Sequence, residues 1–189
     1  MADRIPTPQE ADRLVRVWDP VVRLFHWSLV VSFAIAWLTH ERLAALHHWA
    51  GYAAAGLVLL RLIWGLVGSR YARFAQFLRG PRTTMEYLRD IAAGREQRHL
   101  GHNPAGAAMI VTLMVMMTLT AVTGWMETTN RWFGVDWVQE LHSLAAHGLL
   151  LLVLLHLGGV GLASLRHREN LVRAMIHGHK RAPDPGDIA

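Results

Sequence analysis

Residues 141–165 read LHSLAAHGLLLLVLLHLGGVGLASL, and this stretch decides the fold. It contains no aspartate, glutamate, lysine or arginine. A helix needs about 20 apolar residues to cross the hydrocarbon core of a bilayer, and the stretch is long enough to do so. Its only ionisable side chains are histidines, at positions 142, 147 and 156. The sequence therefore predicts a transmembrane helix that carries imidazoles into the membrane.

Three further segments share this apolar character. They cover about residues 21–38, 47–67 and 105–126, and the rest of the chain is too polar to span a bilayer. Charged residues make up only 17% of the chain, whereas soluble domains carry about 25%. We therefore expect an all-α integral membrane protein, in which residues 1–181 form one four-helix bundle with spans at the three segments above and at 141–165.

The remaining composition narrows the chemistry. Cysteine is absent, which excludes disulfides, iron–sulfur clusters and covalently attached haem. Twelve histidines remain as candidate metal ligands. Residues 182–189 contain Pro183 and Pro185 and are expected to form a disordered tail.

The basic residues predict the orientation. They gather before the first span, between the second and third spans and after the fourth, while the other two connections carry only Arg42 and Arg131. Because arginine and lysine are retained on the cytoplasmic side, both termini and the middle loop are expected to be cytoplasmic. This topology also explains the net charge of +5, so we expect membrane lipid and no nucleic acid as a partner. The basic residues that precede or enter the first span are Arg4, Arg13, Arg16 and Arg23.

Two histidines of the fourth span share one face at two depths. His142 and His156 are fourteen residues apart, which is about 21 Å along a helix and within about 40° of the same direction. An ionisable side chain inside a membrane is costly and is read first as functional. Cofactors in helix bundles lie between facing helices, so this spacing predicts two stacked haems, each with a second histidine from another helix.

Depth in the membrane indicates the second ligands. His26 lies near the cytoplasmic end of the first span, level with His156, and His47 opens the second span on the outer side, level with His142. His40 and His48 are alternatives for the outer position. Gly51 favours His47, because it follows one turn later on the same face and leaves room for a flat ring. The competing interpretation of each single histidine is an interfacial, water-bonded side chain.

Two arginines are candidates for the carboxylates of a haem. Arg61 interrupts the second span fourteen residues inward of His47, at the inner level, and could pair with a propionate. A side chain that extends to the cytoplasmic surface is the alternative. Arg23 is a similar candidate. The histidines of the basic segments, His102 among them, are expected to have no part in the site.

These features occur within motifs that extend from Arg16 to Arg181, and with them the chain resembles the bacterial cytochrome b561 family, which includes the di-haem b subunits of nickel–iron hydrogenases. The resemblance implies haem ligands at His26, His47, His142 and His156, quinone as a redox partner, and the bacterial inner membrane as the location. The motifs are Val17-Trp18-Asp19-Pro20, Arg23, His26-Trp27, His47, Gly51-Tyr52, Arg61, Trp64-Gly65, Tyr71-Ala72-Arg73-Phe74, Gly101-His102-Asn103-Pro104, Thr123-Gly124-Trp125, His142, His156, Glu169-Asn170-Leu171 and Ala174-Met175.

An iron with two imidazole ligands has no open position, so it relays electrons and binds no substrate. The leading hypothesis is therefore an electron-transfer component with two haem b groups, which connects a periplasmic or peripheral redox protein (a c-type cytochrome or a hydrogenase-like protein) with the quinone pool. The alternative is a stand-alone superoxide-to-quinone oxidoreductase. Superoxide is an anion, and the outer connections carry more acidic than basic charge, which disfavours it. The residues are Arg42 and Arg131 against Glu41, Glu127, Asp136 and Glu140. A haem-free membrane scaffold is the third possibility.

Overall fold

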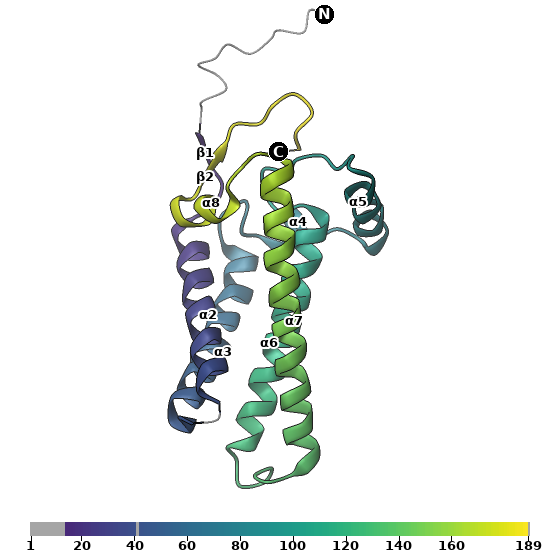
Figure 1. Cartoon of the computed structure of the whole chain (residues 1–189). Helices are drawn as coiled ribbons and strands as arrows, with labels where there is room; N and C mark the ends of the chain where they lie inside the picture. The colour runs from purple at the N-terminus through teal and green to yellow at the C-terminus, as the bar shows by residue number, and fades with distance from the viewer. Residues whose placement is uncertain (1–13, 41, 189) are drawn as a thin grey trace, which may run out of the picture.

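In the computed structural model, which describes residues 14–40 and 42–188, four long helices form the body of the molecule (Figure 1). They are α2 (Pro20–Thr39), α3 (Ala44–Val67), α6 (Pro104–Glu127) and α7 (Asp136–Arg166). All four are long and apolar enough to cross a membrane. The prediction of an all-α bundle with four membrane spans is thereby confirmed, with each helix starting or ending within a few residues of its predicted span.

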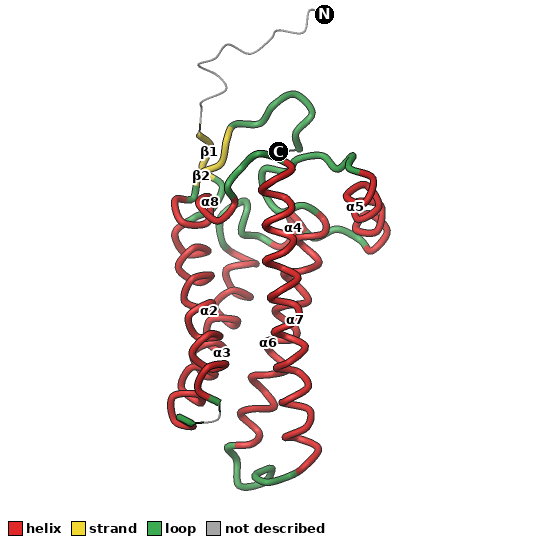
Figure 2. Tube along the Cα trace, in the orientation of Figure 1, coloured by secondary structure: helices red, strands yellow, loops and turns green. Residues whose placement is uncertain are grey.

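The shorter elements gather at one end of the bundle (Figures 1 and 2). They are α4 (Phe74–Phe77), α5 (Pro81–Ala93), α8 (Leu171–His177) and an antiparallel strand pair, β1 (Leu14–Arg16) with β2 (His179–Arg181). We name this end the cap end. The opposite end, which carries the connections from α2 to α3 and from α6 to α7, is the hairpin end. Arg4 and Arg13, which contribute to the predicted orientation, lie outside the described residues.

Local sequence signals start the helices at the cap end. Asp19 accepts a hydrogen bond from the backbone N–H of Val22 at 2.9 Å, and Asn103 accepts one from Gly106 at 2.7 Å. Each cap is followed by a proline, which lacks the N–H that a first helical turn leaves unpaired. The spans α2 and α6 therefore begin at fixed residues at the same end of the molecule.

Asp19 also ties two helices together. Besides Val22, its carboxylate accepts hydrogen bonds from the Ser69 hydroxyl and from Trp64 Nε1, the latter at 3.3 Å. Burial acts to raise the pKa of Asp19, but these hydrogen bonds outweigh it and hold the pKa below its usual value. An ionised Asp19 thus joins the start of α2 to the end of α3.

The helices pack as two hairpins. Helix α2 lies against α3, α6 lies against α7, and α3 contacts α6 to join the pairs. A buried cluster fills the middle of the bundle, and partly buried Leu29 and Phe33 of α2 pack against it. Its members are Ala54, Val58, Met117 and Leu149. Small residues at such contacts let helices approach closely within a membrane.

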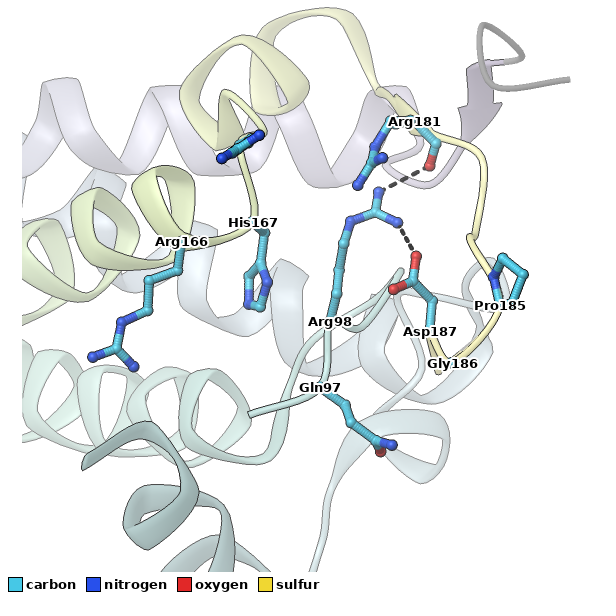
Figure 3. A pocket seen from close by; sticks show the side chains of 9 residues that line it. Gln97, Arg98, Arg166, His167, Arg181, Pro185, Gly186 and Asp187 are labelled. Atoms are coloured by element: carbon cyan, nitrogen blue, oxygen red, sulfur yellow. Dashed lines mark hydrogen bonds and ion pairs between the residues drawn. The ribbon is translucent and has the colours of Figure 1, made fainter. Parts of the chain in front are cut away.

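A buried arginine organises the chain at the cap end (Figure 3). Arg98 pairs with Glu169 at 2.8 Å and with Asp187, and donates a further hydrogen bond to the carbonyl of Arg181 at 2.9 Å. The backbone of Ile188 then donates to the carbonyl of Arg98 at 2.9 Å. The sequence predicts a disordered tail from residue 182 onward. In the structure, residues 182–188 instead return to Arg98, because Asp187 forms an ion pair with its buried guanidinium.

Removal of Arg98 should destabilise the cap end strongly. In Arg98→Met, Glu169 and Asp187 lose their shared cation in a buried setting, which costs roughly 3–5 kcal/mol of the free energy of unfolding. Thermal unfolding in detergent and limited proteolysis of the C-terminal segment would measure this loss. Arg95→Met is the control: the Arg95–Asp90 pair is largely exposed, with side chains 72% and 43% accessible, so its loss costs less than about 1 kcal/mol. Equal effects of the two substitutions would contradict this role of Arg98.

Candidate functional site

Near the hairpin end, two imidazoles from different helices face each other across the bundle. His47 of α3 and His142 of α7 have ring centroids 6.1 Å apart and ring planes at 84°. A transition metal lies about 2 Å from an imidazole nitrogen, so two imidazoles on opposite sides of one metal ion have centroids about 6 Å apart. The observed separation fits a single metal held between these two rings.

Hydrogen bonds from neighbouring helices fix both rings. The Nδ1–H of His47 donates to the carbonyl of Ala36 on α2 at 2.8 Å, and that of His142 donates to the carbonyl of Thr120 on α6 at 3.0 Å. The hydroxyl of Thr123 lies 3.1 Å from the same His142 nitrogen. Metal-binding histidines usually donate their second nitrogen in this way. The arrangement therefore leaves Nε2 of each ring as the nitrogen available to a metal.

Two glycines leave space at this level. A Cβ atom at Gly124 would lie 2.9 Å from Cε1 of His142, so only glycine lets α6 approach this ring without displacing it. Gly51 of α3 has no atom within 4 Å of the position that a Cβ would occupy. This open space agrees with the room that we expected beside His47.

The alternative outer ligands are placed less favourably. His48 is exposed, and its ring contacts that of His47 edge-on at 5.9 Å. His40 is exposed, its Nδ1–H donates to the carbonyl of Trp37 on its own helix at 2.6 Å, and its ring lies 5.8 Å from that of Trp37 at a tilt of 37°. His47, by contrast, is half-buried and faces His142 directly. The geometry thus supports His47 in preference to either alternative.

A second pair of histidines lies nearer the cap end. His26 of α2 and His156 of α7 are both half-buried, and their imidazoles are close enough to interact electrostatically. Nδ1 of His26 is buried and has no hydrogen-bond partner among the residues that the structure describes. Such an unpaired buried nitrogen is costly. It is consistent with a site completed by a bound group, so this pair also fits a cofactor.

Arg61 lies inside the bundle and does not extend to the surface. Its residue is only 4% exposed, and the guanidinium carbon lies 4.9 Å from the ring centre of Phe74 and 6.0 Å from that of Phe77. The alternative of a snorkelling side chain is therefore not what the structure shows. Arg23 has a different environment, because its Nη1 donates to the carbonyl of Ile176 in α8 at 2.5 Å while its Nε is buried without a partner among the described residues.

His102 is the residue that the sequence interpretation missed. Its ring lies between the rings of Trp18 and Phe77, with centroids 4.6 and 4.4 Å away, and its Nδ1 is buried without a hydrogen bond in the described part of the chain. Burial, and then the charges of Arg61 and Lys180, lower the pKa of His102 to about 3. The expectation that His102 has no part in the site assumes a solvated side chain, whereas the structure buries this ring. The signal was its position in the motif Gly101-His102-Asn103-Pro104.

Comparison with known proteins identifies the family of this chain. The family model described as "Prokaryotic cytochrome b561" matches residues 17–178. Two curated relatives are named "Probable Ni/Fe-hydrogenase B-type cytochrome subunit": the protein of Bradyrhizobium diazoefficiens is 23% identical, with 90% of this chain and 87% of the relative covered, and that of Rhizobium leguminosarum bv. viciae is 22% identical, with 92% and 91% covered. No solved structure matches the chain. Since the family model covers most of the chain, including all four spans and the facing histidines, this protein belongs to the prokaryotic cytochrome b561 family.

Proposed function

We propose that the protein holds two haem b groups at two depths and carries electrons between a redox protein on the outer face and the quinone pool. The observation that carries the proposal is the facing pair of His47 and His142. The half-buried His26 and His156, nearer the cap end, provide a second pair at another level. The two levels are set by the spacing of His142 and His156 on α7, about 21 Å along the helix axis. Two relays at that separation connect the two sides of a bilayer whose core is about 30 Å thick.

The chain's own residues would orient the cofactors. At the outer level, the carbonyls of Ala36 and Thr120 hold the two rings so that both Nε2 atoms point into the bundle. His47 with His142, and His26 with His156, would hold the haems, which would supply one-electron chemistry and offer no position for a substrate. The protein therefore acts as an electron-transfer component, and the substrate reactions belong to its partners.

The orientation of the proposed path follows from charge. Most arginines of the described chain lie at the cap end and few at the hairpin end, and the positive-inside rule assigns the cap end to the cytoplasm. His47 and His142 would then hold the outer haem of a protein in the bacterial inner membrane. Quinone, which moves within the bilayer, is proposed as the membrane-soluble partner.

A platform at the hairpin end is proposed as the docking surface for the outer partner. Phe133 and Trp137 are 78% and 50% exposed there, and the Trp132 ring lies 5.5 Å from that of Trp137. Aromatic side chains provide affinity in interfaces, and an acidic rim steers a basic partner. Asp136 and Glu140 of α7 provide that acidic charge. The names of the relatives favour a hydrogenase-like partner, with a c-type cytochrome as the other candidate.

Superoxide oxidation is the second candidate function, and the structure gives it little support. An anionic substrate requires a positive surface near the outer level. Among the described residues of the connection from α6 to α7, Arg131 is the basic one, and its guanidinium lies 5.0 Å from the ring centre of Trp132. The neighbouring carboxylates offset its charge.

Gly124→Ala should disturb the outer haem alone. The new Cβ would lie 2.9 Å from Cε1 of His142 and 3.2 Å from its Nδ1, so the ring must turn away from the metal position. We expect the outer haem signal to be lost or shifted, while the inner haem keeps its spectrum and potential, in a redox titration followed by visible absorption. Gly148→Ala is the control, since its Cβ meets only the flexible end of Met116, at 2.8 Å. An unchanged outer haem in Gly124→Ala would contradict the assignment of His142.

Neutralising the acidic rim should slow electron exchange with a basic partner. Stopped-flow mixing with a small basic c-type cytochrome is expected to slow as salt rises, because screening weakens steering. The double variant Asp136→Asn with Glu140→Gln should slow it several-fold at low salt, while quinone reduction by the chemically pre-reduced protein stays unchanged.

The matched control for this experiment removes two carboxylates at the other end. Glu86→Gln with Asp90→Asn changes the charge equally on α5 at the cap end, and it should leave the exchange rate unchanged. A rate that responds neither to salt nor to Asp136 and Glu140 would exclude this docking surface.

A further inference from the structure

Arg61 is a buried cation whose Nη1 has no acceptor among the residues that the structure describes. Its Nη1 is buried and unbonded, and no ion pair involving it is found among the described residues. Its guanidinium lies over the rings of Phe74 and Phe77. A guanidinium stays protonated in proteins, and a buried charge is stable only when it is paired. In the described part of the chain, Arg61 therefore lacks an anion bonded directly to it.

A second donor without an acceptor lies beside it. His102 and Arg61 both contact Phe77, and the charge of Arg61 acts on the imidazole. The ring of His102 is held from its other side by Trp18, whose backbone N–H donates to the carbonyl of Gly178 at 3.1 Å. The imidazole is thus fixed in place. A neutral ring offers one N–H donor, and its Nδ1 has no partner in the described part of the chain.

The carboxylates of Asp19 and Glu169 at the cap end already have other hydrogen-bond partners. Asp19 attracts Arg61 electrostatically, but its carboxylate takes the hydrogen bonds of Val22, Ser69 and Trp64. Glu169 is held by Arg98, by the backbone N–H of Arg181 and by Lys180 at 3.8 Å. Neither acid is recorded as an acceptor for Arg61 or His102. Since neither acid accepts from Arg61 or His102 among the described residues, an acceptor from a bound molecule fits this pair of donors.

We propose that Arg61 and His102 together bind one carboxylate of the cofactor held between His26 and His156, namely a propionate of the inner haem. This inference rests on the proposed function and adds His102 to the site. Arg61 lies fourteen residues along α3 from His47, the same spacing that separates His142 from His156, so it reaches the inner level. A quinone carbonyl also accepts hydrogen bonds, but it is neutral and would leave the charge of Arg61 without a counterion.

His102→Phe isolates the hydrogen bond from the packing. Phenylalanine keeps an aromatic ring between Trp18 and Phe77 and removes the N–H donor, while His102→Gln restores a donor without the ring. The readout is a redox titration of both haems over a range of pH. A carboxyl group that loses a hydrogen bond to its ionised form has a raised pKa. In His102→Phe, the pH range in which the inner-haem potential depends on pH should therefore move up by about one unit.

Three further measurements show whether the change is confined to the inner haem and to the hydrogen bond of His102. The outer-haem potential should not change in either variant, and His102→Gln should recover most of the shift. His99→Phe is the control: His99 lies in the same segment, but its ring contacts Tyr87, so both haems should behave as in the unmodified protein.

Three results would overturn the inference. Unchanged inner-haem titration in His102→Phe would exclude a shared carboxylate. Unchanged haem titration with impaired quinone reduction would assign the donor pair to quinone. An equal change in both haems would indicate a general structural role. Absence of haem from the unmodified protein is a different outcome, because it would contradict the proposed function itself.

Discussion

Imidazole groups inside a bilayer must find partners, and this constraint governs the middle of the structure. Lipid offers no hydrogen bonds, so every polar group at that depth is satisfied by protein or by a bound group. His47 and His142 meet the constraint on one side only: each donates Nδ1–H to a carbonyl of another helix, Ala36 on α2 and Thr120 on α6. Their rings lie 6.1 Å apart, which leaves the other nitrogens for a bound group. One site therefore involves all four spans, with two providing rings and two providing the carbonyls that hold them.

The cap end handles charge differently from the hairpin end. At the cap end, Arg98 is buried and Asp19 is half-buried. Both form hydrogen bonds or ion pairs with residues that are distant in the sequence. These contacts hold the loops together at the cap end, beside the start of α2 and the end of α3. Against this background Arg61 stands out, because it is a buried cation beside engaged acids. Its environment is explained if the cap encloses a carboxylate that the chain does not supply.

Periodicity and charge in the sequence predict the elements that depend on local signals. The apolar runs predict the four spans, and the fourteen-residue spacing of His142 and His156 predicts two levels on one face of α7. The choice of His47 over His40 and His48 follows from depth and from Gly51, and the ring geometry supports it. The prediction of the spans succeeds because a membrane span must satisfy its backbone within its own helix, so its length can be read from a single segment. The assignment of the histidines to two levels stays a prediction.

Contacts between distant residues are not visible in such patterns. The pairing of Leu14 with Arg181, the return of residues 182–188 to Arg98, and the position of His102 between Trp18 and Phe77 all join segments that are far apart in the sequence. Each looks like an ordinary polar loop when taken alone. His102 in particular is indistinguishable by composition from the other histidines of the same basic segments. Apart from its motif, only the packing of the cap end separates it from them.

The central claim is that four histidines form two pairs at two depths, and a redox titration of four alanine variants tests it most directly. The purified protein should contain two non-covalent haems per chain. His26→Ala and His156→Ala should each abolish the same component of the titration, and His47→Ala and His142→Ala should each abolish the other. One haem per chain would contradict the claim, as would loss of the outer component in His40→Ala but not in His47→Ala.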